Sequence, residues 1–372
     1  MKCKEFSLFE LADWKNGLAF KKIDFSATGK PVIKIAELKN GITGQTQFTQ
    51  GDYGSAVSLT KGDMVFSWSG NPETSIDVFW YDLPDGWLNQ HIFKVTPKCF
   101  VDKNYLYYLL KSLKPKFTAI ASNKQTTGLG HVTVKDLKEM IISLPDMIVQ
   151  KAIGDYLAVI DRKVYLNNKI NDNLERQTQA LYQKYFSEAN NTGVLADLCD
   201  FSKDKIAVSE ISVRNYFSTE NMLSDKKGTT EAANLPAVEQ TTACHIGSVL
   251  VSNIRPYFKK ILYCQCEGGC SADVLCFVPK IPELSAYLYC TLYADKFFDF
   301  MVAGSKGTKM PRGDKKQIMT YSVCLPSENE LKNFNAAVLP MFQLIESNRK
   351  ENARLSLLRD TLLPKLMTGE IL

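Results

Sequence analysis

The run from Leu144 to Phe186 constrains the fold most, because its pattern of apolar residues occurs a second time in the chain. Each copy opens with a Leu-Pro pair, at Leu144-Pro145 and at Leu325-Pro326. The spacing of the apolar residues predicts one seam of a long amphipathic helix. The first seam comprises Ile153, Leu157, Ile160, Val164, Leu174 and Leu181, and 181 residues later the second comprises Phe334, Val338, Met341, Ile345, Leu355 and Leu362.

Asparagines interrupt the two seams at the same offset. Asn167 and Asn171 of the first copy correspond to Asn348 and Asn352 of the second. An Asn in an apolar seam lowers stability but fixes the register and the choice of partner. We therefore expect the two helices to pair lengthwise with each other inside one chain. These four asparagines are our candidates for setting the register of the pair.

The segments that precede the two helices repeat as well. Leu11-Ala12-Asp13 matches Leu195-Ala196-Asp197, and further matches fall at shifts of about 179 to 185 residues. Both segments contain short strand-like runs separated by turn residues. The sequence therefore predicts an α+β fold. Its expected parts are a strand-rich domain at 1–143, a helix at 144–190, a second strand-rich domain at 191–325 and a second helix at 326–372.

Composition indicates an ordinary globular protein with no membrane span. The hydrophobic fraction is 45% and the net charge is +5, which hints at a polyanionic partner without establishing one. The first residues do not resemble a signal peptide, and no window approaches 18 uncharged apolar residues. The ten cysteines include no paired CxxC step, so we expect reduced thiols that fill core space. The expected location is the cytoplasm.

The sequence contains no catalytic motif. Its three histidines, His91, His131 and His245, are widely scattered, and it has no phosphate-binding loop, no dinucleotide fingerprint and no nucleophile elbow. We therefore predict a chain that is not itself an enzyme and that binds no metal. A stand-alone enzyme with an unrecognised site remains an alternative.

Two polar loops at matching positions suggest nucleic-acid binding. Residues 122–128 offer amide, hydroxyl and ammonium groups without an acid, and residues 305–312 do the same with three positive charges. Phosphates are bound by Lys, Arg and hydroxyl groups, and Asn, Gln, Arg and Lys read base edges. Ordinary solvated loops are the alternative for either segment alone. With the neighbouring strand ends included, the candidate DNA-binding residues are Ser69, Asn71, Lys124, Gln125, Thr126, Thr127, His131, Asn253, Arg255, Tyr257, Lys259, Lys306, Thr308, Lys309 and Arg312.

Several motifs resemble those of one family. Leu144-Pro145 with Gln150 opens the first helix, and the second ends in Leu-Leu-Arg-Asp-Thr-Leu-Leu-Pro-Lys-Leu-Met-Thr-Gly-Glu-Ile at 357–371. Lys61-Gly62-Asp63 precedes a strand, and residues 87–91 read Trp-Leu-Asn-Gln-His. Over nearly its whole length the chain resembles the specificity subunits of type I restriction-modification systems.

The resemblance implies a reader of double-stranded DNA. It implies that the helices pair as an antiparallel coiled coil with pseudo-two-fold symmetry and hold two target-recognition domains apart. Each domain would read one half of a split, asymmetric target, and the helices would dock two methyltransferase subunits. No contact residue transfers by motif, because recognition residues in this family vary with the target.

The resemblance also assigns the cofactors to partner subunits. S-adenosylmethionine would be bound by the methyltransferase subunits, and ATP and magnesium by restriction subunits, so this chain is expected to bind no cofactor. A protein–protein adaptor without a role on DNA is a further alternative. The two domains differ in basic residues, since the first contains Lys and no Arg, whereas the second includes Arg255 and Arg312. We therefore expect two different half-sites.

Overall fold

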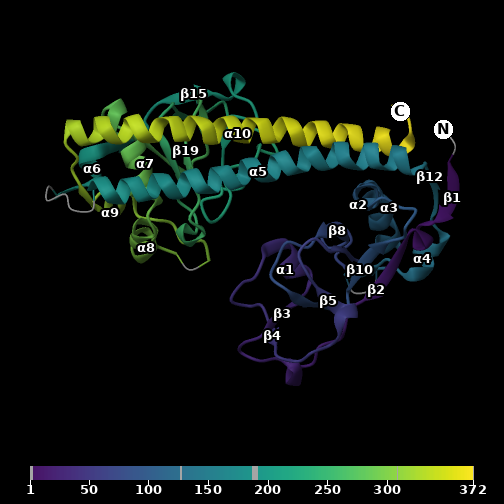
Figure 1. The fold of residues 1–372 in the computed structure, drawn as a ribbon. Coiled ribbons are helices and arrows are strands. Elements are labelled where there is room, and N and C mark those ends of the chain that lie inside the picture. The colour runs from purple at the N-terminus through teal and green to yellow at the C-terminus, as the bar shows by residue number, and fades with distance from the viewer. Residues whose placement is uncertain (1–2, 126–127, 187–191, 308, 372) are drawn as a thin grey trace. The chain divides into compact units, whose positions relative to one another are not determined.

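The computed structural model describes residues 3–125, 128–186, 192–307 and 309–371. It divides into two compact units (Figure 1). Unit 1 comprises Met1–Tyr165 with Asn352–Leu372, and unit 2 comprises Leu166–Glu351. The helices α5 (Met147–Phe186) and α10 (Glu328–Thr368) each contribute to both units.

Unit 1 contains two four-stranded sheets. The first is antiparallel throughout and has the order β2 (Ala12–Asn16), β10 (Ile92–Pro97), β6 (Met64–Ser67) and β8 (Asp77–Trp80). The second has the order β4 (Phe48–Thr49), β3 (Lys30–Ile33), β9 (Gly86–Leu88) and β5 (Ser58–Leu59), and β3 and β9 are parallel. Two short ladders pair β1 (Lys4–Ser7) with β12 (Ile141–Leu144) and β7 (Ser69–Gly70) with β11 (Gly130–His131).

Two helices of unit 1 begin at residues whose side chains cap them. Asp102 accepts a hydrogen bond from the amide of Tyr105 at the start of α2, and Thr133 caps α4. Such caps satisfy amides that have no partner within the helix. The helices are η1 (Leu8–Leu11), η2 (Lys22–Asp24), α1 (Ile35–Asn40), η3 (Ser55–Val57), α2 (Lys103–Ser112), α3 (Lys114–Asn123) and α4 (Val134–Glu139).

Unit 2 repeats the plan of the first sheet, whereas in its second sheet the parallel strand pair lies at the edge and not at the centre. Its first sheet has the order β14 (Cys199–Phe201), β21 (Val274–Pro279), β18 (Val249–Ser252) and β19 (Ile261–Tyr263). Its second has the order β15 (Lys205–Ala207), β17 (Gln240–Cys244), β20 (Gly268–Cys270) and β16 (Tyr216–Phe217), and β13 (Thr192–Val194) pairs with β22 (Ser322–Cys324). The helices are α6 (Leu195–Leu198), η4 (Val208–Glu210), η5 (Pro256–Phe258), η6 (Pro282–Leu284), α7 (Ser285–Tyr293), α8 (Asp295–Ala303) and α9 (Lys315–Ile318). The predicted repeat of strand-rich segment and helix is confirmed.

Each apolar core includes the beginning of the long helix that follows it in sequence. Ile153 and Leu157 of α5 are buried in the core of unit 1, and Phe334 and Val338 of α10 are buried in the core of unit 2. Burial of one such side chain stabilises the fold by roughly 1.5–3 kcal/mol. The predicted seams therefore do more than join the helices, since their first residues pack against a globular domain. Further along the seams Ile160 and Ile345 are also buried, whereas the remaining positions are half-buried, namely Val164, Leu174, Leu181, Met341, Leu355 and Leu362.

The two long helices pair antiparallel. In unit 2, Asn348 Nδ2 donates to Asn171 Oδ1 at 2.8 Å, and Asn167 Nδ2 donates to Glu351 Oε2 at 2.7 Å. Residue numbers rise along α5 as those of its partners on α10 fall, and Figure 1 shows the two helices side by side. The predicted helix pair is thereby confirmed. Asn352, the fourth candidate for the register, is half-buried on the part of α10 in unit 1.

The cysteines of unit 2 fill apolar space. Cys264, Cys270 and Cys276 are buried with Cys244 in one small cluster, and Cys266 packs against it. All ten cysteines are free thiols. Within the described ranges, no group of three or more His, Cys, Asp or Glu is placed to hold a metal ion. No helix there is both long and apolar enough to span a bilayer.

The Asn171–Asn348 contact leads to a prediction about stability. Asn171→Ala leaves the buried amide of Asn348 without this partner, which costs about 1–3 kcal/mol in the free energy of unfolding. Urea denaturation followed by circular dichroism measures the change. Asn173→Ala, at an exposed position on the same helix, should stay within about 0.5 kcal/mol of the parent chain. Equal stabilities of the two variants would contradict a structural role for the asparagine pair.

Candidate functional site

In unit 1 three segments meet beyond the end of β6. The amide of Val132 donates to the carbonyl of Trp68 at 2.9 Å, and the amide of Trp68 donates to the carbonyl of His91 at 3.2 Å. β7 and β11 place Ser69 opposite His131. We call this site corner 1 and define it by Trp68, Ser69, His91 and His131.

In unit 2 the same backbone connections recur beyond the end of β18. The amide of Gly313 donates to the carbonyl of Asn253 at 3.3 Å, and the amide of Asn253 donates to the carbonyl of Asp273 at 2.8 Å. A bridge places Ile254 opposite Arg312. We call this site corner 2 and define it by Asn253, Ile254, Asp273 and Arg312. The equivalent pairs are Trp68 and Asn253, Ser69 and Ile254, His91 and Asp273, and His131 and Arg312.

The side chains of corner 1 are aromatic and mostly neutral. His131 Nδ1 lies 2.9 Å from Ser69 Oγ, and the Trp68 ring centroid lies 5.6 Å from that of His91 and 5.9 Å from that of His131. Trp68 Nε1 donates to Asn16 Oδ1 at 3.0 Å. Burial lowers the pKa of His91, and the nearby His131 lowers it further, so His91 is neutral at pH 7. This corner offers ring faces and neutral hydrogen-bonding groups.

Corner 2 carries charges instead. Arg312 Nε donates to Asp273 Oδ1 at 3.0 Å, and both side chains are partly exposed. Asn253 is 7% exposed, and its Oδ1 has no hydrogen-bond partner among the described residues. The neighbouring Arg255 has a left-handed backbone, with φ of 50°, and its buried Nε likewise lacks a partner within the described ranges. This corner offers a guanidinium, a carboxylate and an amide.

The loop lysines that the sequence suggested are partly engaged by acids of their own domain. Lys124 forms an ion pair with Asp136 of α4, and Lys306 Nζ lies 2.7 Å from Asp314 Oδ2 at the start of α9. The two ion pairs sit at equivalent places in the repeat, where each ties a loop to a short helix. Lys309 is exposed in the second loop. Lys124 and Lys306 therefore have structural contacts in addition to the DNA contacts proposed for them.

The other candidates are distributed around the corners. Asn71 Oδ1 closes a turn by accepting hydrogen bonds from the amides of Glu73 and Thr74. Lys259 Nζ forms an ion pair with Asp295 Oδ1 at 2.9 Å, and Tyr257 is 49% exposed. Gln125 is exposed after the end of α3, whereas Thr126, Thr127 and Thr308 lie outside the described residues.

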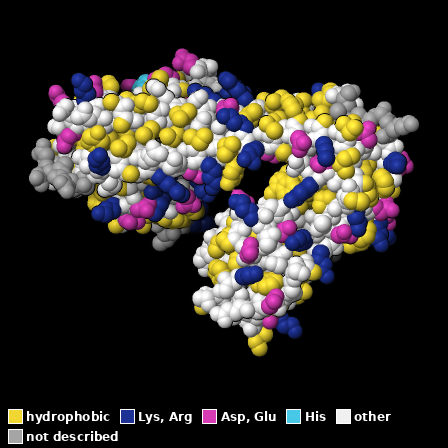
Figure 2. Space-filling model, in the orientation of Figure 1, with side chains coloured by type: hydrophobic (Ala, Val, Ile, Leu, Met, Phe, Trp, Pro, Cys, Tyr) yellow, Lys and Arg dark blue, Asp and Glu magenta, His cyan; other side chains and the backbone are white. Residues whose placement is uncertain are grey.

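Positive charge forms no single continuous patch on the face that Figure 2 shows. Lys and Arg side chains are interspersed there with Asp and Glu on the surface of each unit. A net charge of +5 spread in this way gives only a modest long-range attraction for a polyanion. Any recognition of a polyanion by this chain therefore depends more on specific groups at the corners than on bulk charge.

Comparisons with known proteins agree with the fold and the motifs. Residues 2–176 match the family model described as type I restriction modification DNA specificity domain. The chain is 24% identical over 315 residues to the type I restriction enzyme MjaIX specificity subunit of Methanocaldococcus jannaschii, covering 76% of this chain and 72% of that protein. The chain is thus similar to type I restriction-modification specificity subunits, and its residues 2–176 match their DNA specificity domain.

Two further comparisons cover different shares of the chain. The type I restriction enzyme EcoBI specificity subunit of Escherichia coli is 25% identical over 153 residues, which are 41% of this chain and 31% of that protein. The crystal structure of the type I restriction-modification system S subunit from M. genitalium matches with a TM-score of 0.62 at 17% identity, covering 98% and 96% of the two chains. This structural likeness shows that the two chains share a fold.

Part of each corner was not predicted from the sequence. Trp68, His91 and Asp273 are not among the residues that the sequence suggested for DNA binding. A signal was available, because the strands that carry Trp68 and Asn253 are related by a shift of 185 residues. Aligning each strand with its own shift, instead of one common offset, would have placed the equivalent positions together.

The close packing behind corner 1 leads to a prediction. A Cβ added at Gly130 would lie 2.4 Å from the carbonyl oxygen of Ala121, so Gly130→Ala must displace β11 and with it His131. The expected cost is about 1–3 kcal/mol in the free energy of unfolding, measured by thermal denaturation.

Gly128→Ala provides the matched control two residues away. A Cβ there meets open space, and only its φ of +86° opposes the substitution, at about 1 kcal/mol. If Gly130→Ala proved no more destabilising than Gly128→Ala, the close contact with Ala121 would not constrain the corner.

Proposed function

We propose that this chain reads a split, asymmetric target in double-stranded DNA, one half with each globular domain. The observation that carries the proposal is the equivalence of the two corners. Their backbone hydrogen bonds correspond, whereas the side chains differ at all four positions. A common frame with variable side chains is what two readers of different sequences require, because base-edge contacts carry the sequence information.

The chemistry of each corner suggests what it reads. Arg312 in corner 2 can donate two hydrogen bonds to the O6 and N7 of guanine, and Asp273 can accept from the amino group of cytosine. Corner 1 presents the hydroxyl of Ser69 and the ring nitrogens of His131, which can form hydrogen bonds with base edges. Because the two sets of groups favour different bases, the two half-sites should differ and the whole target should not be a palindrome.

Phosphate contacts would orient the domains on the duplex without selecting a sequence. Lys309 is exposed beside corner 2, and Gln125 is exposed beside corner 1. The loops at 122–125 and 305–307 are therefore accessible, which favours DNA over the adaptor role that buried loops would have indicated. Each phosphate neutralised by a lysine should make binding more dependent on salt concentration.

We further propose that the paired helices dock two methyltransferase subunits, and that the chain itself is not catalytic. Exposed apolar residues on α5 and α10 support this role, among them Val159 at 67% and Leu357 at 67% exposure. S-adenosylmethionine would act in the methyltransferase subunits, and ATP and magnesium in restriction subunits. The helices would also set the gap between the half-sites, since each added residue lengthens a helix by about 1.5 Å.

Arg312→Gln tests the reading role of corner 2. In cells that contain the partner methyltransferase, genome-wide mapping of methylated bases should show relaxed specificity at one position of one half-site. The expected loss of discrimination is about 1–3 kcal/mol, because a bidentate contact to one base is removed.

His131→Gln is the matched variant of corner 1 and should alter the other half-site only. Lys309→Gln should lower methylation at all sites without changing the recognised bases. A change in both half-sites from a single substitution, or an unchanged motif in both corner variants, would contradict the proposal.

A further inference from the structure

One carboxylate on α5 joins three elements in unit 1. Asp161 accepts a hydrogen bond from Arg359 Nη1 of α10 at 2.6 Å and another from the hydroxyl of Tyr108 on α2 at 2.7 Å. The side chains of Asp161 and Arg359 are about 30% exposed, and Tyr108 is buried. The two long helices and the globular domain therefore meet at a single acidic group.

The contact between α2 and α5 around this joint is close. A Cβ added at Gly154 of α5 would lie 2.6 Å from the amide nitrogen of Tyr105 on α2. Asn104 Nδ2 donates to Asp155 Oδ1 at 3.0 Å on the same side of the helix. The domain thus rests directly on α5, and Tyr108 completes a row of contacts between the two helices.

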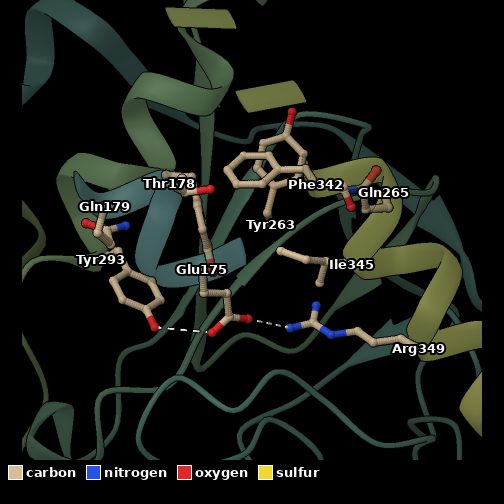
Figure 3. A pocket seen from close by; sticks show the side chains of 10 residues that line it. Glu175, Thr178, Gln179, Tyr263, Gln265, Tyr293, Phe342, Ile345 and Arg349 are labelled. Atoms are coloured by element: carbon tan, nitrogen blue, oxygen red, sulfur yellow. Dashed lines mark hydrogen bonds and ion pairs between the residues drawn. The ribbon is translucent and has the colours of Figure 1, made fainter. Parts of the chain in front are cut away.

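Unit 2 has a corresponding joint, which Figure 3 shows from close by. Glu175 of α5 accepts from Arg349 Nη2 of α10 at 3.1 Å and from the hydroxyl of Tyr293, at the end of α7, at 3.5 Å. A cavity of about 20 Å³ adjoins these side chains, which is room for about one water molecule. Burial raises the pKa of Glu175, nearby Asp172 raises it further, and Arg349 and Tyr293 oppose the shift.

The two joints use the same types of side chain but differ in the length of their hydrogen bonds. In each, an acid of α5 accepts from an arginine of α10 and from a tyrosine of the neighbouring domain. Hydrogen bonds to ionised groups are stronger and more directional than neutral ones, whereas a partly buried ion pair adds little net stability. The contribution of such a joint is therefore mainly geometric. At 2.7 Å the tyrosine contact of unit 1 is the firmer of the two.

We propose that Asp161 and Glu175 are positioning residues that fix the angle of each reading domain on the helix pair, and thereby determine how strictly the complex measures the gap between half-sites. This inference rests on the proposed function. Adding one base pair moves the second half-site by about 3.4 Å and rotates it by about 34–36°. A domain held firmly at its joint rejects such a target, and a domain with a loosened joint accepts it.

Tyr108→Phe is the sharpest test because it removes one hydroxyl and keeps the ring. Methylated bases are mapped genome-wide in cells that carry the partner methyltransferase and each variant. The recognised bases should stay the same. Methylation at sites whose gap is one base pair longer or shorter should rise about tenfold relative to the wild-type chain, which corresponds to about 1.4 kcal/mol.

Three further variants complete the design. Asp161→Asn should relax the gap at least as much as Tyr108→Phe, because it weakens both contacts of the carboxylate. Tyr293→Phe should have a smaller effect, since its contact with Glu175 is 3.5 Å long. Asn173→Ala changes an exposed residue of the same helix and should leave the gap unchanged.

The outcomes separate this inference from the function on which it rests. If the wild-type chain directs no split motif, the proposed function fails. If the motif appears and Tyr108→Phe keeps a single gap length, the joints do not position the domains, and the inference is overturned even if Asp161→Asn abolishes methylation. A change in the recognised bases with an unchanged gap would also overturn it.

Discussion

Burial of one face of each long helix against a globular domain is the constraint on which the structure depends. Ile153 and Leu157 complete the core of unit 1, and Phe334 and Val338 complete that of unit 2. Another face of each helix then packs against the other helix, where Asn348 donates a hydrogen bond to Asn171. The same two helices therefore complete the cores of the two units and pair with each other.

Under the proposed function, a fixed backbone frame with exchangeable side chains would let the target change while the fold is kept. The groups that form the corners are backbone amides and carbonyls, and any residue except proline supplies both. Close packing lies behind the corners, as at Gly130 against Ala121, whereas the side chains that differ lie at the end of the sheet. His131 and Arg312 each contact another side chain of their own corner, Ser69 and Asp273 respectively.

The helices and the repeat could be predicted from sequence because both leave periodic patterns. The apolar spacing of 153–181 and 334–362 identifies the helices, and the common offset identifies the two domains. The corners depend on contacts between distant segments, such as the amide of Trp68 with the carbonyl of His91, and loops of unequal length shift their alignment. The ion pairs of Lys124 and Lys306 escaped prediction for the same reason. Their acidic partners are 12 and 8 residues away, beyond any local pattern.

Similarity to specificity subunits and the geometry of the two corners together support the account of this chain as a sequence-reading subunit. The measurement that tests it most directly is genome-wide mapping of methylated bases in matched cells with and without this chain, with the methyltransferase partner present in both. We expect a motif with two unequal halves and one fixed gap, present only when the chain is expressed. Methylation that is identical without the chain, or a palindromic motif with it, would contradict the account.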